Sequence, residues 1–152
     1  MSLSARDKQL IQSSFAKVLP IADKAAEIFY KTLFSYDPSL KHLFKGDMRK
    51  QGQMLMSTLK VAVDGLDDLE AVAGVLQKLA IRHVDYGVKM EDYTPVGNAL
   101  LFTLKQGLGK DFTPQTRQAW KNVYQLIADV MRSCAYPNFD KKTFKNNKVY
   151  YR

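Results

Sequence analysis

Hydrophobic residues recur every three or four positions along almost the whole chain, and this period constrains the fold more than any other feature. One series, with spacings of 3, 4, 3 and 4, consists of Leu69, Val72, Leu76, Leu79 and His83. Such spacing places side chains on one face of an α-helix. The alternation of apolar and polar residues that is typical of strands is essentially absent. The sequence therefore predicts an all-α fold of about seven or eight helices joined by short turns.

Three helix starts are marked by a capping residue followed by proline, at Asp37-Pro38, Thr94-Pro95 and Thr113-Pro114. Asp and Thr accept hydrogen bonds from the free N–H groups of a first turn, and proline needs no such bond there. Ser4, with Asp7 three residues later, provides a further cap near the start of the chain. The apolar spacing predicts helices over residues 20–36, 48–65, 69–83, 96–108 and 114–132.

The composition is that of one ordinary soluble domain: 152 residues, 46% hydrophobic and 25% charged. No apolar run approaches the ~20 residues that a membrane-spanning helix needs. The polar start of the chain lacks the apolar segment of a secretory signal. The single cysteine, Cys134, cannot form an internal disulfide, which suits a reducing compartment. We therefore expect a soluble, cytoplasmic protein.

The chain is basic, with 23 Lys and Arg against 15 Asp and Glu and a net charge of +8. Half of this excess follows residue 134, where five basic residues face one acid, Asp140. We expect a domain over residues 1–134 and a basic C-terminal extension over residues 135–152. The extension could contact an anionic partner such as nucleic acid or a membrane. A solvated, poorly ordered end is the favoured interpretation, because the extension contains no known binding module, and no nucleic-acid partner is expected.

Only two histidines are present, His42 and His83, and His83 ends the apolar series described above. On that pattern alone, a core histidine bonded to a backbone carbonyl is the more common explanation. A metal ligand is the alternative, but no Cys or second His lies near enough in sequence to complete a zinc site. A haem would need only this one histidine, because the porphyrin supplies four nitrogens and the protein only an axial ligand.

Five segments carry a pattern known from one protein family: residues 29–34, Asp37-Pro38 with Leu43-Phe44, 82–89, 93–101 and 111–124. In this order and spacing they resemble globins, and within that family the neuroglobin-like single-domain branch of animals and bacteria. The resemblance covers about residues 4–132. It implies a globin fold that encloses one haem b.

The resemblance also implies which residues hold the haem. His83 matches the proximal iron ligand, and Phe44 matches a phenylalanine that stacks on the porphyrin. Four further positions match residues that pack around the haem: Leu79, Val88, Tyr93 and Val96. His42 falls on a position that is usually at the surface, and we expect it to be solvated.

On the distal side, the resemblance places Tyr30 and Gln51 over the iron, with Leu55 one turn after Gln51. Without it, Gln51 would be taken for a surface residue and Tyr30 for a core residue. Both side chains are hydrogen-bond donors. O₂ on ferrous haem carries negative charge, and a charge-assisted bond contributes about 1.5–3 kcal/mol. Two such donors imply tight O₂ binding and slow release, with less effect on CO.

Two departures from related globins bear on function. The distal position holds no histidine, unlike neuroglobin, so a five-coordinate ferrous iron is expected. Some bacterial globins pair a proximal tyrosine with a glutamate that makes the iron-ligating histidine a stronger donor. Tyr93 matches the tyrosine, but the glutamate's place is Ala135. The chain also lacks a Gly-rich dinucleotide-binding fingerprint.

Three functions remain open at this stage. The first is reversible binding of O₂, and also of CO and NO, by a monomer or weak oligomer. The second is NO dioxygenation, in which NO and O₂ give nitrate and a separate reductase recycles the iron. The third is gas sensing through a partner protein.

Overall fold

The structure is a computed structural model that describes residues 3–136 and 139–140. It confirms the all-α prediction: within those residues it contains six α-helices, four short 3-10 helices and no strand. The α-helices are α1 (Ala5–Val18), α2 (Ala22–Tyr36), α3 (Met48–Asp64), α4 (Leu69–Asp85), α5 (Tyr93–Leu108) and α6 (Pro114–Ala135). The 3-10 helices are η1 (Leu19–Ile21), η2 (Pro38–Leu43), η3 (Met90–Asp92) and η4 (Gly109–Asp111).

The number of α-helices is thus slightly smaller than expected, because the helix expected to start at Asp37-Pro38 is the six-residue 3-10 helix η2. Of the predicted basic extension, residues 137–138 and 141–152 lie outside the described residues.

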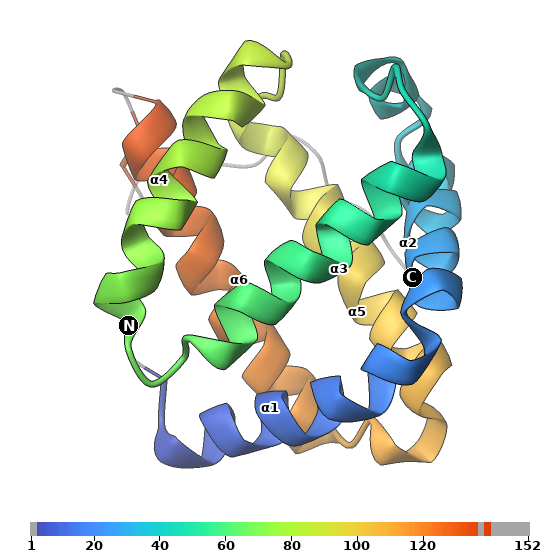
Figure 1. The fold of residues 1–152 in the computed structure, drawn as a ribbon, viewed down its shortest axis with the longest axis vertical. Coiled ribbons are helices and arrows are strands. Elements are labelled where there is room, and N and C mark those ends of the chain that lie inside the picture. Colours follow the sequence, from blue (N-terminus) through green and yellow to red (C-terminus); the bar gives the residue numbers. More distant parts are fainter. Residues whose placement is uncertain (1–2, 137–138, 141–152) are drawn as a thin grey trace.

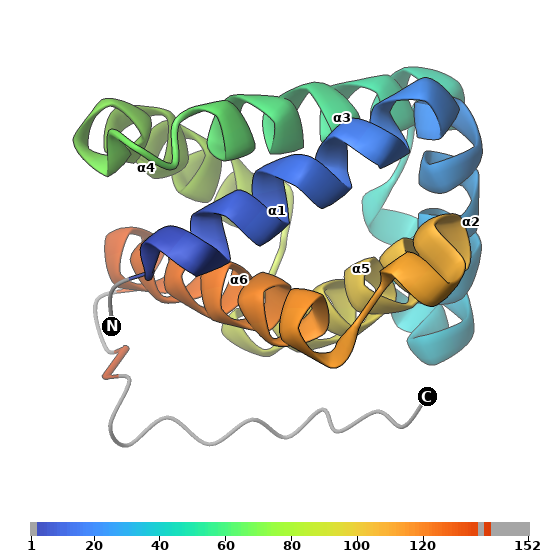
Figure 2. The same ribbon diagram turned by 90° about the horizontal axis from the view of Figure 1, so that it is seen from below.

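The helices form two crossed layers (Figures 1 and 2). Helices α3 and α4 lie on one side and α5 and α6 on the other, while α1 closes one end of the molecule. Helix α2 packs against both α3 and α5, and α6 packs against both α4 and α1. The C-terminal end of α4 and the segment η2 lie at the opposite end of the molecule from α1, at the top of Figure 1.

Two clusters of buried side chains fill the space between the layers. The larger one includes Ile11, Phe15 and Trp120, and the indole N–H of Trp120 donates to Ser14 Oγ at 2.9 Å. This bond satisfies a polar group that would otherwise be buried without a partner. The smaller cluster joins α4, α5 and α6 and consists of Val72, Leu76, Ala80, Tyr93, Ala128 and Met131.

The predicted caps at Ser4, Asp37 and Thr113 are confirmed, because each side chain accepts a backbone N–H of the turn that follows it. The start predicted at Thr94-Pro95 is wrong. Helix α5 already begins at Tyr93, directly after η3, so Thr94 and Pro95 lie inside its first turn. Proline is tolerated there because first-turn N–H groups have no partner within the helix.

Candidate functional site

His83 lies in the last turn of α4 and is half-buried. Its Nδ1 is 2.8 Å from the backbone oxygen of Leu79, one turn earlier. Since a carbonyl can only accept, Nδ1 carries the proton and Nε2 keeps a free lone pair. Burial lowers the pKa of His83 below the usual 6.5, so the imidazole is neutral at pH 7. A neutral imidazole with a free Nε2 is the form that binds a metal.

The turn after α4 brings the chain back beside His83. Gly87 has a φ of 97°, which glycine adopts without strain. Its N–H donates to Val84 O at 3.0 Å, and the N–H of Val88 donates to His83 O at 2.9 Å. This pair of bonds is a Schellman motif and fixes Val88 next to the histidine. A Cβ on Gly87 would lie 3.4 Å from the Leu43 side chain, so the turn also approaches η2.

Tyr93, the first residue of α5, stacks on His83, with ring centroids 6.3 Å apart and planes 18° from parallel. Two features of α5 and α6 hold Tyr93 there. The hydroxyl of Tyr124 donates to Tyr93 O at 2.5 Å, and Gly97 leaves room for the Tyr124 ring, which would lie 2.6 Å from a Cβ. The hydroxyl of Tyr93 is buried and finds no hydrogen-bond partner within the described residues. Burial also raises the pKa of Tyr93.

Four aromatic rings from α2 and the end of η2 form a compact group: Phe29, Tyr30, Phe34 and Phe44. The Tyr30 ring lies edge-on to Phe44, with centroids 5.3 Å apart, and Phe34 lies 5.4 Å from Phe44. Phe44 itself is only half-buried. It is therefore fixed by neighbouring rings and retains surface for a further contact.

Tyr30 and Gln51 meet because α2 and α3 cross closely. A Cβ on Gly52 would lie 2.8 Å from Ala26 Cβ, so only glycine permits this approach without a shift. Tyr30 follows Ala26 by one turn, and its hydroxyl lies 3.5 Å from Gln51 O. Burial raises the pKa of Tyr30 to about 12, partly opposed by hydrogen bonding to Gln51. Leu55, one turn after Gln51, is half-buried.

The structure thus places the nine residues singled out from the sequence in two groups. One group packs with the larger core cluster and comprises Tyr30, Phe44, Leu55 and Val96, and Gln51 belongs to it through its contact with Tyr30. The other, from α4 to α5, packs with or beside the smaller one and comprises Leu79, His83, Val88 and Tyr93. Five apolar members pack on the core yet are only half-buried: Phe44, Leu55, Leu79, Val88 and Val96. Half-buried apolar side chains in both groups, together with one free imidazole nitrogen, are the kinds of groups that a large apolar cofactor contacts. His42 is exposed, as expected.

The donor set restricts which metal could bind. Residues 3–136 and 139–140 contain no group of three or more His, Cys, Asp or Glu side chains that could hold an ion. A metal at His83 must therefore bring its other ligands with it, as iron does in a porphyrin.

One buried residue next to this site was missed from the sequence. Arg132 is 4% exposed, and its Nε donates to Met90 O at 3.0 Å. A signal was available, since Arg132 follows Ala128 by four residues and so shares its buried helix face.

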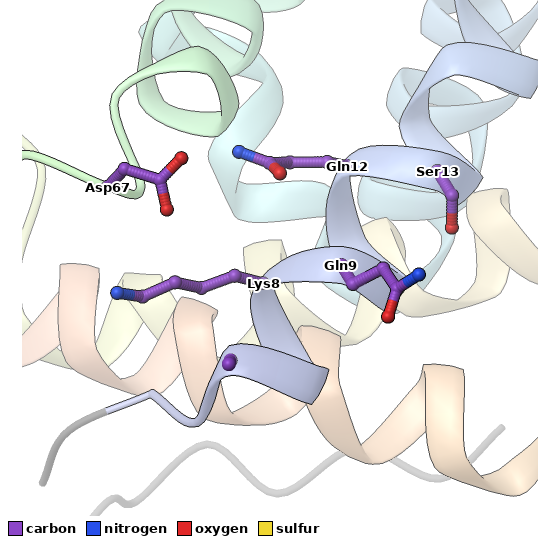
Figure 3. Close-up of a pocket in the computed structure, with 6 residues that line it drawn as sticks. Lys8, Gln9, Gln12, Ser13 and Asp67 are labelled. Atoms are coloured by element: carbon purple, nitrogen blue, oxygen red, sulfur yellow. The ribbon is translucent and has the colours of Figure 1, made fainter.

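A pocket of about 520 Å³ opens at the other end of the molecule, where Lys8 and Gln12 of α1 face Asp67 (Figure 3). Asp67 precedes α4, whereas His83 lies in the last turn of that helix. At 1.5 Å per residue, the helix separates the two by about 20 Å. This pocket is therefore not part of the histidine site.

A family model described as Globin matches residues 27–131. The chain belongs to the globin family. It is 30% identical to a neuroglobin of Tetraodon nigroviridis over 91% of this chain and 97% of that protein. It is also 32% identical to a flavohemoprotein of Halalkalibacterium halodurans, over 85% of this chain but 32% of that protein. The chain thus spans about a third of the length of the flavohemoproteins that it matches.

Solved structures show the same fold at low identity. An engineered carbene transferase derived from a putative nitric oxide dioxygenase of Rhodothermus marinus superposes with a TM-score of 0.82 and 24% identity, covering 90% of this globin and 95% of that chain. A hexacoordinated heme protein from a tardigrade gives a TM-score of 0.81 and 18% identity, and the match covers 88% of this globin and 95% of that chain. These likenesses support the globin fold.

Membership of the family implies that this globin binds haem. The free Nε2 of His83 and the half-buried apolar side chains of the two groups fit that cofactor in their chemistry. Among the described residues, none of the helices combines the length and apolarity that a bilayer crossing requires.

Proposed function

We propose that this globin binds O₂ reversibly, and also CO and NO, on a haem b held by His83. The observation that carries the proposal is the hydrogen bond from His83 Nδ1 to Leu79 O, which leaves a neutral imidazole with Nε2 free. Haem iron would supply the atom that binds the gas. Phe44, Leu55 and Val96 would contact the porphyrin from one group, and Leu79, Val88 and Tyr93 from the other.

On the distal side, Tyr30 and Gln51 would donate hydrogen bonds to the O₂ ligand. The raised pKa of Tyr30, about 12, keeps its hydroxyl protonated at neutral pH. Its contact with Gln51 O is long, at 3.5 Å, so redirecting the hydroxyl to a ligand sacrifices little. The amide of Gln51 is a second donor on the adjoining helix.

An absorption spectrum tests this function directly. The purified protein, reduced with dithionite and then exposed to O₂ or CO, should show a five-coordinate ferrous spectrum that changes reversibly with each gas. A protein that takes up no haem, or whose ferrous haem binds neither gas, would refute the proposal.

NO dioxygenation is a second candidate, supported by the similarity to flavohemoproteins over about a third of their length. In this reaction NO, O₂ and one electron give nitrate; haem held by His83 would supply that electron, and a separate reductase would return it.

The surface near the site fits such a partner. Two segments that approach one another through Leu43 and Gly87 carry six exposed cations, which we call the basic rim: Lys41, Lys45, Arg49, Lys50, Arg82 and Lys89. The acids within the same segments are Asp47 and Asp85. None of the six cations forms an ion pair with the part of the chain that the structure describes. The rim therefore suits an electron donor with an acidic face.

Nitrate formation from NO, O₂ and NADPH with a purified flavin reductase tests this candidate. Turnover should fall as ionic strength rises and in Lys45→Glu/Lys50→Glu, but not in Lys105→Glu, an exposed lysine of α5. Absence of nitrate while the reductase keeps the iron ferrous would exclude the activity.

A further inference from the structure

The buried arginine of α6 is the strongest feature that the proposed function does not use. Arg132 lies in the last turn of the helix and is 4% exposed. Its Nε donates to Met90 O at 3.0 Å, which ties α6 to the turn between α4 and α5. Its guanidinium carbon lies 5.4 Å from the centroid of the Tyr93 ring and 5.9 Å from that of Phe139. These contacts offset the cost of burying the arginine and fix the position of its guanidinium.

Tyr93 lies between Arg132 and His83 and contacts both. The Tyr93 ring that the guanidinium contacts is the ring that stacks on His83. The hydroxyl of Tyr93 has no hydrogen-bond partner within the described residues, so it does not fix the ring. What holds the ring is its packing, the bond from Tyr124 to its backbone oxygen, and the guanidinium.

We propose that Arg132 is a positioning residue for the iron-ligating histidine: it holds Tyr93 against His83, and its buried charge favours the ferrous state of the haem. The inference rests on the proposed ligation by His83. It concerns a different residue and a different property, the reduction potential.

The expected direction follows from charge. Ferric haem carries one more positive charge than ferrous haem, so a buried cation nearby disfavours oxidation. The buried carboxylate of Asp92, which also acts on Tyr93, remains when Arg132 is replaced. Because this carboxylate is the same in both proteins, the change in potential reports the loss of the cation.

The experiment compares midpoint potentials of the haem-loaded protein by spectroelectrochemistry. In Arg132→Met, the ferric-to-ferrous ratio at a fixed potential should rise by about tenfold, which is 59 mV for one electron. The iron–histidine stretching band of the ferrous protein should also shift or broaden, because Tyr93 no longer holds the imidazole as firmly. Arg132→Lys should restore most of the potential, since it keeps the charge.

Arg117→Met is the matched control, because it removes the same charge from the first turns of the same helix, about 22 Å away along its axis. Should Arg132→Met fail to fold, Arg132→Gln carries the same test, as it removes the charge but keeps a donor. An unchanged potential in the neutral variant, or an equal fall in Arg117→Met, would overturn the inference. If the parental protein binds no haem, it is the proposed function that fails.

Discussion

Gly52 of α3 and Ala26 of α2 approach so closely that a Cβ on the glycine would lie 2.8 Å from the Ala26 Cβ. This crossing determines where two other residues lie. Tyr30 is one turn after Ala26 and Gln51 directly precedes Gly52, so the approach of the helices brings the tyrosine hydroxyl to 3.5 Å from Gln51 O. The distal pair of the proposed site therefore depends on a glycine that has no side chain to contact a ligand.

Gly52→Val should separate α2 from α3 and destabilise the protein by about 1–3 kcal/mol, the usual cost of overpacking. The measurement is the free energy of unfolding in urea. Gly74→Ala is the control: Gly74 is exposed on α4 and a Cβ there meets nothing within 4 Å. It should stabilise the protein by about 0.5–1 kcal/mol, because alanine favours the helix. Equal effects of the two changes would show that the crossing is not tight.

Much of this architecture could be predicted from the sequence, because its causes are local. The 3.6-residue period gives the helices, and the side-chain oxygens of Ser4, Asp37 and Thr113 begin the turns that were expected. The start predicted at Thr94-Pro95 was wrong because α5 follows directly after η3, with Asp92 as its N-cap. The helix therefore begins at Tyr93, earlier than the proline pattern indicates. Local pattern cannot show which of two neighbouring turns starts a helix.

The site depends on contacts between distant parts of the chain, and these could be predicted only through resemblance. Nothing local in the sequence places Tyr30 beside Gln51, since the crossing of α2 and α3 brings them together, or Tyr93 beside His83, since the turn between α4 and α5 determines how the two rings meet. The spacing of Arg132 from Ala128 indicated that it lies on the buried face of its helix, but that spacing could not show the distant turn at Met90 that accepts its hydrogen bond. An arginine at a helix end is ordinarily solvated, and only packing of α6 against the turn at Met90 buries this one.

His83→Gly should abolish haem binding by the protein alone, because no other histidine lies at the site. Added imidazole should restore a haem spectrum, since it can occupy the place of the lost side chain and ligate the iron. His42→Ala, at the exposed histidine of η2, should bind haem like the parental protein. Titration with haem, followed by absorption, measures all three; normal haem uptake by His83→Gly without imidazole would disprove the ligand assignment.

The ferrous protein without added gas should be five-coordinate. Gln51 and Tyr30, the two polar side chains of the proposed distal side, are a neutral amide and a phenol kept protonated by its raised pKa. Neither is a strong ligand for ferrous iron. Absorption and resonance Raman spectra at neutral pH should show high-spin iron, whereas sharp low-spin bands would mean that a second side chain binds the metal as its sixth ligand.

Acid should release the haem and destabilise the fold. The pKa of His83 is lowered by burial, so the unfolded chain takes up this proton at a higher pH than the folded protein does. The stability that His83 contributes is therefore fully present above about pH 6.5, the ordinary pKa of histidine. It is lost as the pH falls toward the lower pKa of His83 in the folded protein. Protonation also removes the Nε2 lone pair. The urea midpoint of the haem-free protein, followed from pH 8 to pH 4, should decline below pH 6.5, and the haem absorption band should be lost as the pH falls further; a decline that begins on raising the pH would contradict this assignment.

Replacing the distal tyrosine should change the release of O₂ far more than that of CO. Tyr30→Phe removes one hydroxyl and little volume, and the three neighbouring aromatic rings still hold the phenylalanine in place. If the hydroxyl contributes about 1.5–3 kcal/mol to bound O₂, release should quicken by about ten- to a hundredfold. CO carries less negative charge, so its release should change much less. Gln51→Leu should act in the same direction, and the two effects need not add because both donors serve one ligand.

Because the pKa of Tyr30 is about 12, the parental rate should not vary between pH 6 and pH 9 through this group. Phe34→Leu is a suitable control, since it alters the same aromatic group without removing a donor. Stopped-flow displacement of O₂ by CO measures each rate; parental rates in both distal variants would mean that neither side chain donates to the ligand.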